Sequence, residues 1–473
     1  MHVRLHAAAL ALTVLTAHHS AIAQSSRGGA VSRDVIARAT DSLANAAIKN
    51  GPVAALSIAV VRGRDTIVMK GYGFADVENE VPATAQTIYR IGSVTKQFTS
   101  AAIMGLVEQG KVSLDDDVTK FVPNAPVQGR KVLVRHLLNH TSGIPSYTDI
   151  GPVFGRHIRT DLTPDSLLAL VRSDSLQFEP GRHFYYNNTG YYLLGMIIEK
   201  VTGKKYGEYL KETFFAPNGL SSTLYCSVSP IIKRRAQGYE RGPGGLVNAS
   251  YISMDLPYAA GSLCSSVGDL VAWTRLLHSG KIVSPASFQA MTTPVKLPVP
   301  RPMSYGYGLV SDTLGSHRRI QHGGGINGFI SSLAHYPSDS LTIVVLANTA
   351  PAPSDQLADD IARVAFGMPP RTPPARPADL PIAAEESARL VGNYRLGWPN
   401  GARRPTRIYT ENGQLMIQIE GQPALKLMKQ PEPNTFVITN QPGRIRFDVA
   451  NGNVTGFVIE RGARSLEAVR VPQ

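Results

Sequence analysis

Ser93-Val94-Thr95-Lys96 opens the most apolar helical segment of the chain. Apolar residues follow it at four-residue spacing and also fill its other faces as far as Gly110. A helix that is apolar nearly all round is buried, so this segment predicts a helix in the core. Ser93 and Lys96 stand three residues apart and therefore share one face of that helix.

This spacing has two interpretations. A serine hydroxyl is a weak nucleophile until a base removes its proton. Lys96 can be that base if burial and the positive end of the helix favour its neutral form. Alternatively, Ser93 is only the N-cap of the helix and Lys96 is a solvated residue of its first turn. A serine and a lysine at this spacing also occur by chance, so the rest of the chain has to decide.

The composition describes a globular protein with a targeting segment at its start. The chain has 473 residues, of which 43% are hydrophobic and 18% charged. Arg4 precedes the apolar run Ala7 to Ala17, and Ala21-Ile22-Ala23 has the small-x-small pattern of a cleavage site. We therefore expect a signal peptide over residues 1–23, cleaved after Ala23. The mature protein would be exported, periplasmic or extracellular, without a membrane-spanning segment.

The charged and metal-binding residue types exclude several classes of function. The net charge is +13, but the basic residues are scattered rather than interleaved with aromatics as in a nucleic-acid surface. The histidines are dispersed, and no HExxH motif or Cys/His cluster is present, so we expect neither a metal nor another cofactor. In an oxidising compartment, Cys226 and Cys264 are either a disulfide or two buried thiols, and both possibilities stay open.

Strand patterns at both ends of the main part of the chain predict its fold class. Ala54 to Val61 and Thr66 to Tyr72 have the composition of a β-hairpin, and two more strands are expected over 328–336 and 341–348. Residues 114–277 between them are mainly helix and loop. We expect an α+β fold, with an antiparallel sheet flanked by helices, a mostly helical subdomain beside it and a cleft between the two.

The C-terminal part has a different pattern. After a proline-rich stretch, short segments of alternating hydrophobicity are separated by the turn signals Asn412-Gly413 and Asn451-Gly452. We expect a small all-β domain, plausibly a barrel. The expected division of the chain is a signal peptide at 1–23, a flexible lead at 24–33, a main α+β domain at 34–366, a proline-rich linker at 367–385 and the β-domain at 386–473.

Two further stretches can complete a site around Ser93. Before a predicted helix, Tyr185/Asn187 and Tyr186/Asn188 both form a Tyr-x-Asn pair, in which tyrosine can relay a proton and asparagine can orient a lysine. The alternative is a helix N-cap at Asn188 beside packed tyrosines.

The second stretch is His322-Gly323-Gly324-Gly325. Glycines at a strand edge admit a substrate backbone, and an N–H there can form an oxyanion hole with the N–H of Ser93. The alternative is a glycine-rich turn with an incidental histidine.

Ser93-x-x-Lys96, a Tyr-x-Asn pair and His322-x-Gly324, in this order, resemble the motif set of the serine β-lactamase and penicillin-binding-protein superfamily. The similarity is greatest to its class C β-lactamase-like branch, which includes D-Ala-D-Ala carboxypeptidases, D-aminopeptidases and esterases. Supporting stretches are Leu137 to Pro145, Pro180-Gly181 ahead of Phe184, Gly261-Ser262-Leu263 with Asp269-Leu270, and Val344 to Asn348. The resemblance covers about residues 34–366, and the C-terminal domain resembles lipocalin-like additions to some members.

The resemblance implies a role for each matching residue. The family pattern Pro-Gly-x-x-Phe-x-Tyr-Ser-Asn selects Tyr186 and Asn188, with Asn187 in place of the serine. Ser93 would be acylated, Lys96 and Tyr186 would share proton transfer, and Asn188 would orient them.

His322 would replace the lysine of the family's Lys-Thr/Ser-Gly motif, followed by Gly324, and the Gly325 N–H would join that of Ser93 in the oxyanion hole. A lysine there keeps a positive charge towards a substrate carboxylate, whereas histidine is mostly neutral at pH 7. We therefore expect an exported serine hydrolase that forms an acyl-enzyme on an ester, peptide or amide carbonyl, as an esterase, D-Ala-D-Ala carboxypeptidase or D-aminopeptidase does. Its partner would be a small-molecule or peptide substrate.

Three alternatives remain. One is a β-lactamase, and another is a non-catalytic module of the same fold that binds peptidoglycan fragments. The third places the nucleophile at Ser142, beside His140, although no Gly-x-Ser-x-Gly elbow surrounds that serine.

Overall fold

The structure is a computed structural model of the chain. It describes residues 31–51, 53–150, 155–172, 175–242, 244–297, 303–371, 378–397, 403–420, 422, 424–439, 443–450, 452–461 and 464–471. The expected signal peptide, most of the expected lead and part of the proline-rich linker lie outside the described residues.

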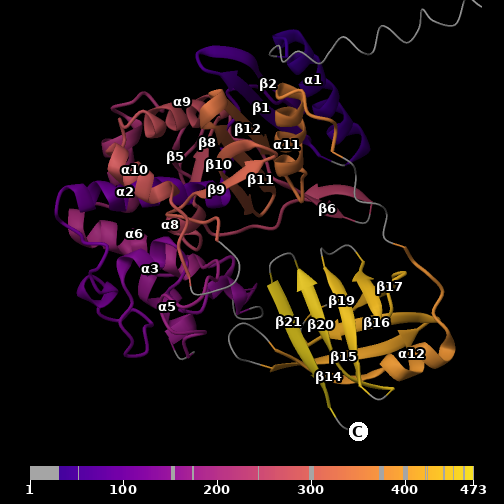
Figure 1. The fold of residues 1–473 in the computed structure, drawn as a ribbon. Helices are drawn as coiled ribbons and strands as arrows, with labels where there is room; N and C mark the ends of the chain where they lie inside the picture. Colours follow the sequence, from indigo (N-terminus) through magenta and orange to yellow (C-terminus); the bar gives the residue numbers. More distant parts are fainter. Residues whose placement is uncertain are drawn as a thin grey trace, which may run out of the picture.

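A seven-stranded antiparallel sheet forms the centre of the larger part (Figure 1). Its strand order is β3-β2-β1-β12-β11-β10-β9. The strands are β1 (Ala55–Arg62), β2 (Asp65–Asp76), β3 (Val81–Pro82), β9 (Val310–Leu314), β10 (His317–Ile326), β11 (Phe329–Tyr336) and β12 (Leu341–Ala347). Strand β1 pairs with β12, with Leu56 opposite Ala347, so the predicted sharing of one sheet by early and late strands is confirmed.

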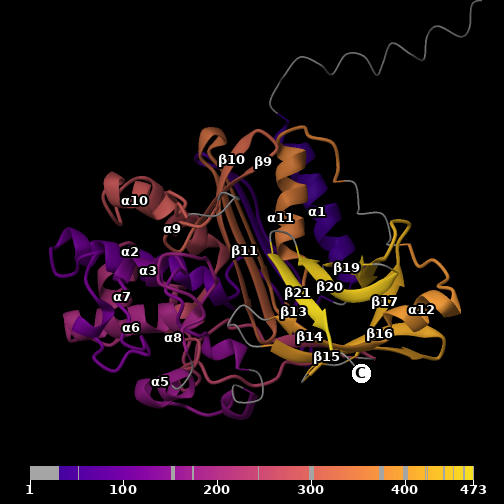
Figure 2. The same cartoon turned by 60° about the horizontal axis from the view of Figure 1, so that its bottom comes forward.

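Helices cover both faces of this sheet, because β1 and β12 are buried along almost their whole length. On one face lie α1 (Arg33–Asn50) and α11 (Ser354–Ala365), and on the other lie α2 (Thr95–Glu108) and α9 (Val267–His278) (Figure 2). All side chains of α2 from Thr95 to Met104 are buried, as its all-round apolar pattern predicts. Helix α2 is therefore a core element of the fold, and Lys96 lies in its first turn.

The mostly helical subdomain is also present. Its helices are α3 (Val134–Leu138), α5 (Pro164–Arg172), α6 (Asn188–Thr202), α7 (Tyr206–Leu210) with a π-helical turn at Lys211–Phe215, α8 (Tyr258–Gly261) and α10 (Pro285–Thr292). Two small sheets accompany them, one of β4 (Tyr89–Arg90), β5 (Leu224–Tyr225) and β8 (Leu263–Ser265), the other of β6 (Tyr239–Gly242), β7 (Gly245–Asn248) and β13 (Thr349–Ala350). Among the helices that the structure describes, none has the length and apolarity needed to cross a membrane.

The C-terminal part closes into a β-barrel, as its alternating pattern predicts. The strands are β14 (Gly392–Gly397), β15 (Arg403–Glu411), β16 (Gln414–Ile419), β17 (Leu425–Lys429), β18 (Thr435–Ile438), β19 (Arg444–Ala450), β20 (Asn453–Arg461) and β21 (Arg464–Arg470), preceded by α12 (Ala384–Leu390). Its interior is filled by a core of its own that contains Tyr394, Phe436, Phe447 and Phe457. Closure removes free sheet edges, so the barrel buries its backbone polar groups without help from the larger part.

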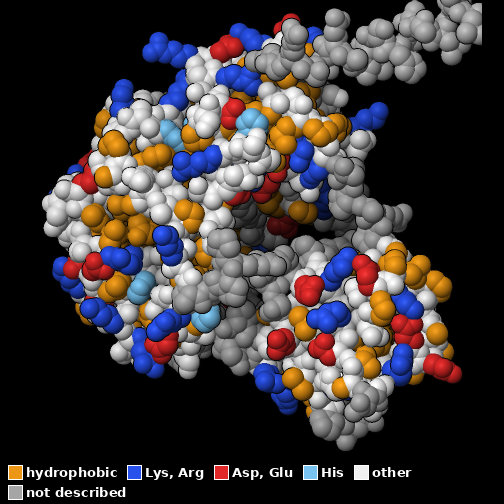
Figure 3. All heavy atoms as spheres, viewed as in Figure 1, with side chains coloured by type: hydrophobic (Ala, Val, Ile, Leu, Met, Phe, Trp, Pro, Cys, Tyr) orange, Lys and Arg blue, Asp and Glu red, His pale blue; other side chains and the backbone are white. Residues whose placement is uncertain are grey.

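Basic side chains are distributed over the face seen in Figure 3 and alternate with acidic ones. This view agrees with the scattered basic residues of the sequence. A net charge of +13 spread in this way favours solubility over a defined polyanion site.

Cys226 and Cys264 form a disulfide, with their Cα atoms 5.2 Å apart. Both sulfur-bearing side chains are fully buried. Cys226 directly follows β5 and Cys264 lies in β8, so the bond fastens the segment after α7 to the strand that follows α8.

We expect replacement of both cysteines by serine to lower the free energy of unfolding by about 2–4 kcal/mol, because the bond closes a loop with a sequence separation of 38. Chemical denaturation of the double variant and the oxidised wild type measures the difference. Reducing agent should lower the wild-type stability and leave the variant unchanged. Equal stabilities of the two oxidised proteins would contradict the prediction.

Candidate active site

Ser93 lies in a tight 3₁₀ turn, Gly92–Val94, immediately ahead of α2. The N-cap position of α2 is Val94, and no side chain caps the helix, so the interpretation of Ser93 as an N-cap is wrong. The extra turn separates Ser93 from the first free N–H groups of α2. Its half-buried hydroxyl instead accepts a hydrogen bond of 3.1 Å from Lys96 Nζ.

Lys96 is fully buried, so its interpretation as a solvated residue is also wrong. Its Nζ donates to Asn188 Oδ1 at 2.9 Å and to the carbonyl of Ala260 at 2.9 Å, in addition to Ser93. No carboxylate in the described part of the chain forms an ion pair with Lys96. Burial therefore lowers the pKa of Lys96 well below its ordinary value.

These three contacts specify what neutral Lys96 does. A neutral amine has two N–H donors and one lone pair. The Ala260 carbonyl and Asn188 Oδ1 have only acceptor oxygens towards Nζ, so they take the two donors. The ammonium form donates its third proton to Ser93. Once that proton is lost, the lone pair faces the Ser93 hydroxyl, which can then donate to it, as a general base requires.

Asn188 is the first residue of α6, and its amide is held from the opposite side. Its backbone N–H donates to Ser146 Oγ at 3.2 Å and its Nδ2 donates to Thr148 Oγ1 at 3.2 Å, which leaves Oδ1 towards Lys96. The helix N-cap is Asn187, whose side chain accepts from Gly190 N–H, so the interpretation of Asn188 as the cap is wrong. Asn187 therefore caps the helix, and Asn188 orients Lys96.

The structure brings Tyr186, rather than Tyr185, to Lys96. The Tyr186 ring centroid lies 4.7 Å from Lys96 Nζ, whereas the Tyr185 hydroxyl donates to Asp149 at 2.8 Å. Burial raises the pKa of Tyr186, and the nearby Ser93 hydroxyl offsets only part of the rise. The Tyr186 hydroxyl is buried and makes no hydrogen bond of good geometry with the described residues, so it is a neutral donor aimed into the site.

His322 lies in β10 and is buried, with 5% of its surface exposed. Its Nδ1 is 2.6 Å from the Gly323 carbonyl, and its Nε2 is 2.9 Å from the Tyr305 hydroxyl. A carbonyl can only accept, so Nδ1 carries the proton and Nε2 accepts from Tyr305. Burial, reinforced by the charge of Lys96, lowers the pKa of His322 to about 4, so the imidazole is neutral at pH 7.

The backbone of β10 lies directly against the turn that carries Ser93. A Cβ on Gly324 would lie 2.1 Å from the Ile91 carbonyl, and one on Gly92 would lie 2.9 Å from Gly325 N. Gly92 also has a φ of 49°, which side chains disfavour. This contact brings the Gly325 and Ser93 backbones together, as the predicted oxyanion hole requires.

The sequence did not identify β9 and β10 as strands, and it missed several supporting groups. Tyr305, within a stretch of alternating glycine and tyrosine, fixes His322, while the Ala260 carbonyl, Ser146 and Thr148 fix Lys96 and Asn188. A backbone carbonyl has no sequence signature, and serine and threonine are common in loops.

His140 is a further buried support and excludes the Ser142 alternative. Its Nδ1 accepts from Asn187 N–H at 3.0 Å, and its ring lies 4.3 Å from that of Tyr186. The Ser142 hydroxyl accepts instead from Ile144 N–H at 3.3 Å. With Nδ1 occupied and Nε2 without a partner among the described residues, His140 is not a base for Ser142, and that alternative is wrong.

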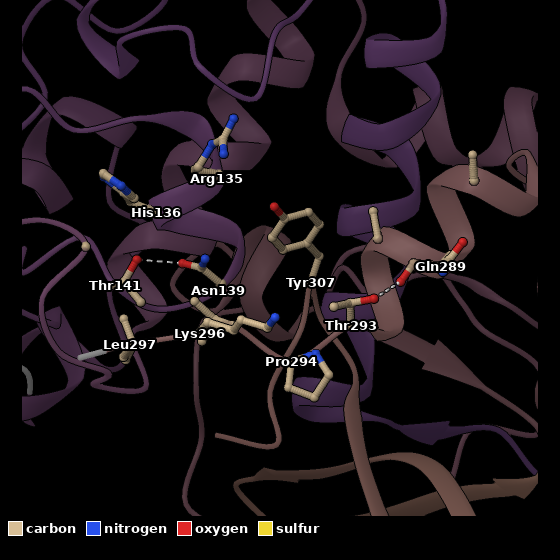
Figure 4. A pocket seen from close by; sticks show the side chains of 14 residues that line it. Arg135, His136, Asn139, Thr141, Gln289, Thr293, Pro294, Lys296, Leu297 and Tyr307 are labelled. Atoms are coloured by element: carbon tan, nitrogen blue, oxygen red, sulfur yellow. Dashed lines mark hydrogen bonds between the residues drawn. The ribbon is translucent and has the colours of Figure 1, made fainter. Parts of the chain in front are cut away.

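A cavity of about 600 Å³ adjoins the loop that contains His140 (Figure 4). Asn139 and Thr141, which flank His140, line it and hydrogen-bond to each other at 2.7 Å. Lys296 and Tyr307 also line it. None of the predicted catalytic residues lines this cavity, so it is distinct from the site around Ser93.

Comparison with known proteins agrees with this geometry. The family model described as Beta-lactamase matches residues 40–367, which include every residue around Lys96 described above. The chain belongs to the Beta-lactamase family. It is 28% identical over 435 residues to penicillin-binding protein 4* of Bacillus subtilis (strain 168), covering 88% of this chain and 94% of that protein.

Two other relatives carry names of enzymes. A D-aminopeptidase of Gluconobacter oxydans (strain 621H) is 27% identical over 72% of this chain, which spans 62% of that protein's length. The crystal structure of a D-stereospecific amidohydrolase from Streptomyces sp. matches this structure with a TM-score of 0.60. The two sequences are 30% identical, and the match covers 70% of this chain and 98% of the amidohydrolase chain. The chain is a serine hydrolase related to β-lactamases and penicillin-binding proteins.

We expect Lys96→Arg to slow the labelling of Ser93 by a fluorophosphonate by about 10²–10⁴-fold, because a guanidinium has no lone pair at neutral pH. In the wild type the labelling rate should rise with pH as Lys96 loses its proton. Since the pKa of Lys96 is lowered, this rise should be complete well below pH 10.5. Labelling of the arginine variant at the wild-type rate would contradict the assignment of Lys96 as the base.

Proposed function

We propose that this chain hydrolyses amides and esters whose leaving group has no free carboxylate, through an acyl-enzyme on Ser93. D-amino-acid amides and small esters belong to this class of substrate. The observation that carries the proposal is the neutral state of His322. By the family resemblance, His322 stands in the position of the lysine of the Lys-Thr/Ser-Gly motif.

The environment of His322 keeps this position uncharged. Its two nitrogens are occupied by Gly323 O and the Tyr305 hydroxyl, and its pKa of about 4 keeps it neutral at physiological pH. A substrate carboxylate that enters here loses its hydration and meets no fixed positive charge from His322. Burying an unpaired charge costs more free energy than burying an uncharged amide or ester, so uncharged leaving groups are favoured.

The proposed reaction uses the contacts of Lys96 in order. Lys96 takes the proton of Ser93 as Oγ bonds to the substrate carbonyl carbon, and the N–H groups of Ser93 and Gly325 bind the resulting oxyanion. The carbon–nitrogen or carbon–oxygen bond then breaks, and the leaving group receives a proton through the Tyr186 hydroxyl, which Lys96 resupplies. Water, activated in the same way, attacks the acyl-enzyme, releases the acid and restores Ser93.

The relatives support the same class of chemistry. The D-aminopeptidase and the D-stereospecific amidohydrolase are named for D-configured substrates. The rival proposal, a module that only binds peptidoglycan fragments, explains neither the buried Lys96 nor its alignment on Ser93. A buried lysine without an ion pair costs stability, and a binding protein has no need for it.

A paired hydrolysis assay tests the substrate class. We expect the kcat/KM of a D-Ala-D-Ala peptide amide to exceed that of the same peptide with a free carboxylate by about tenfold, because only the second buries a charge beside His322. Ser93→Ala should abolish both activities. A higher kcat/KM for the free carboxylate in the wild type would overturn the proposed substrate class while leaving the serine mechanism intact.

His322→Lys provides the matched variant. The new ammonium should raise the relative kcat/KM for the carboxylate substrate by about tenfold, since one charge pair at a partly desolvated site accounts for that factor. Tyr305→Phe is the control, because it removes the hydrogen bond to His322 Nε2 without adding a permanent charge. An unchanged ratio in His322→Lys would show that this position does not set the preference.

We also propose that the protein is exported and loses residues 1–23. The pattern ending at Ala21-Ile22-Ala23 supports export, and a disulfide between Cys226 and Cys264 is typical of an oxidising compartment. Expression of the full chain in a Gram-negative host, followed by fractionation and N-terminal sequencing, should give a periplasmic protein that begins at Gln24. A cytoplasmic protein that retains Met1 would contradict export.

A further inference from the structure

A second cavity in the helical subdomain is lined by none of the residues around Ser93. It has a volume of about 1190 Å³ and is enclosed by α6, α7 with its π-helical turn, α8 and β5. Figure 2 shows α6, α7 and α8 side by side on the same side of the sheet as α2. Neither Ser93, Lys96, Tyr186 nor His322 lines the cavity, and nothing in the proposed reaction uses it.

Four tyrosines form an aromatic wall in this cavity: Tyr192, Tyr206, Tyr225 and Tyr258. The ring of Tyr258 lies 4.8 Å from that of Tyr192 and 5.2 Å from that of Tyr206. Tyr192 is only 2% exposed, and its hydroxyl has no hydrogen-bond partner among the described residues. A hydroxyl without a partner on an otherwise buried side chain at a cavity wall is a polar group available to a ligand.

Carboxylates dominate the charge of the cavity lining. Asp161, Glu199, Glu208 and Asp255 face two lysines, in a chain whose net charge is +13. Glu199 is satisfied by Tyr206 N–H and lies 3.7 Å from Lys205. Asp161 and Asp255 have no ion pair with any lysine or arginine that the structure describes.

Asp161 and Asp255 are both exposed residues of the lining, and their charges repel each other. Partial burial, and then the charge of Asp161, raise the pKa of Asp255. Their hydrogen bonds come from uncharged donors, Ser253 Oγ to Asp161 and the Tyr225 hydroxyl to Asp255 at 3.4 Å. A cation placed between them would relieve this repulsion.

We propose that this cavity is a second binding site, for an organic ammonium ion that also carries an aromatic or apolar group. The ammonium lies between Asp161 and Asp255, where the charge is uncompensated, and the apolar group packs on Tyr192 and Tyr258. Tyrosine faces attract cations as well as apolar groups, so the wall contributes to both parts of the ligand. The volume accommodates a ligand considerably larger than a single aromatic amine.

The site is independent of the proposed hydrolysis. Helix α8 forms the partition, with Tyr258 lining the cavity and the Ala260 carbonyl bonded to Lys96 on the other side. Binding can therefore be measured in a full-length protein that has lost its nucleophile. Its failure would leave the Ser93 assignment untouched.

Calorimetric titration of Ser93→Ala with 2-phenylethylammonium tests the proposal, with 2-phenylethanol as the uncharged analogue. We expect the ammonium to bind at least about tenfold more tightly, and its affinity to fall as ionic strength rises. The double variant Asp161→Asn/Asp255→Asn should bind 2-phenylethylammonium about tenfold more weakly than Ser93→Ala alone, and its affinity for 2-phenylethanol should be unchanged. Asp34→Asn, which removes an exposed carboxylate of α1, is the matched control and should change neither.

Competition with the active site gives a second measurement. Wild-type protein labelled on Ser93 with a fluorophosphonate should bind 2-phenylethylammonium as tightly as unlabelled Ser93→Ala. Loss of binding on labelling would place the probe at Ser93 and overturn the proposal. Equal affinities for ammonium and alcohol, or unchanged ammonium binding in the double asparagine variant, would also overturn it.

Discussion

The burial of Lys96 without a carboxylate partner is the constraint on which the site depends. Removing an ammonium from water costs several kcal/mol unless charge or hydrogen bonds compensate, and here only uncharged oxygens surround Nζ. The amine therefore gives up its proton more easily than an exposed lysine. The free energy that burial costs lowers the pKa of Lys96 and so favours its neutral, basic form, which is a common exchange of stability for function.

The rest of the fold can be understood as the means of holding three acceptors around that amine. Ser93 comes from the turn ahead of α2, Asn188 from the start of α6 and the Ala260 carbonyl from α8. A shift of about 1 Å in any of these elements would break a hydrogen bond. The buried faces of α2, α6 and α8 in one core restrict such shifts, and the disulfide fastens the strand that leaves α8.

The sequence predicted the framework of this arrangement better than its details. The sharing of one sheet by early and late strands, the buried helix, the barrel and the roles of Ser93 and Lys96 could be proposed because each depends on a periodic pattern or on a short motif. Strand β10 could not, because the glycines from Gly323 to Gly325 erase the alternation by which strands are recognised. The N-cap assignments failed for a related reason, since a single 3₁₀ turn or a shift of one residue moves the cap without changing the pattern.

Partners that lie far apart in sequence were the least predictable part. Tyr305 donates to Nε2 of His322, and His140 holds the segment that carries Tyr186, yet neither contact follows from local spacing. Only the folded seven-stranded sheet brings these segments together, because β10 reaches the Ser93 turn through its pairing with β11, which pairs in turn with β12. The sequence therefore predicts the reacting groups, while the tertiary structure decides their protonation.

This distinction bears on how the enzyme recognises substrates. Burial lowers the pKa of both Lys96 and His322, although the chain as a whole carries a net charge of +13. A site without fixed positive charge recognises a carbonyl by backbone N–H groups and by shape, which do not discriminate between amide and ester. Discrimination then falls to the walls of the cleft and to the cost of burying any charge on the substrate. Under the proposed function, selectivity comes mainly from the substrates that the site excludes, and the neutral His322 makes that exclusion specific for carboxylates.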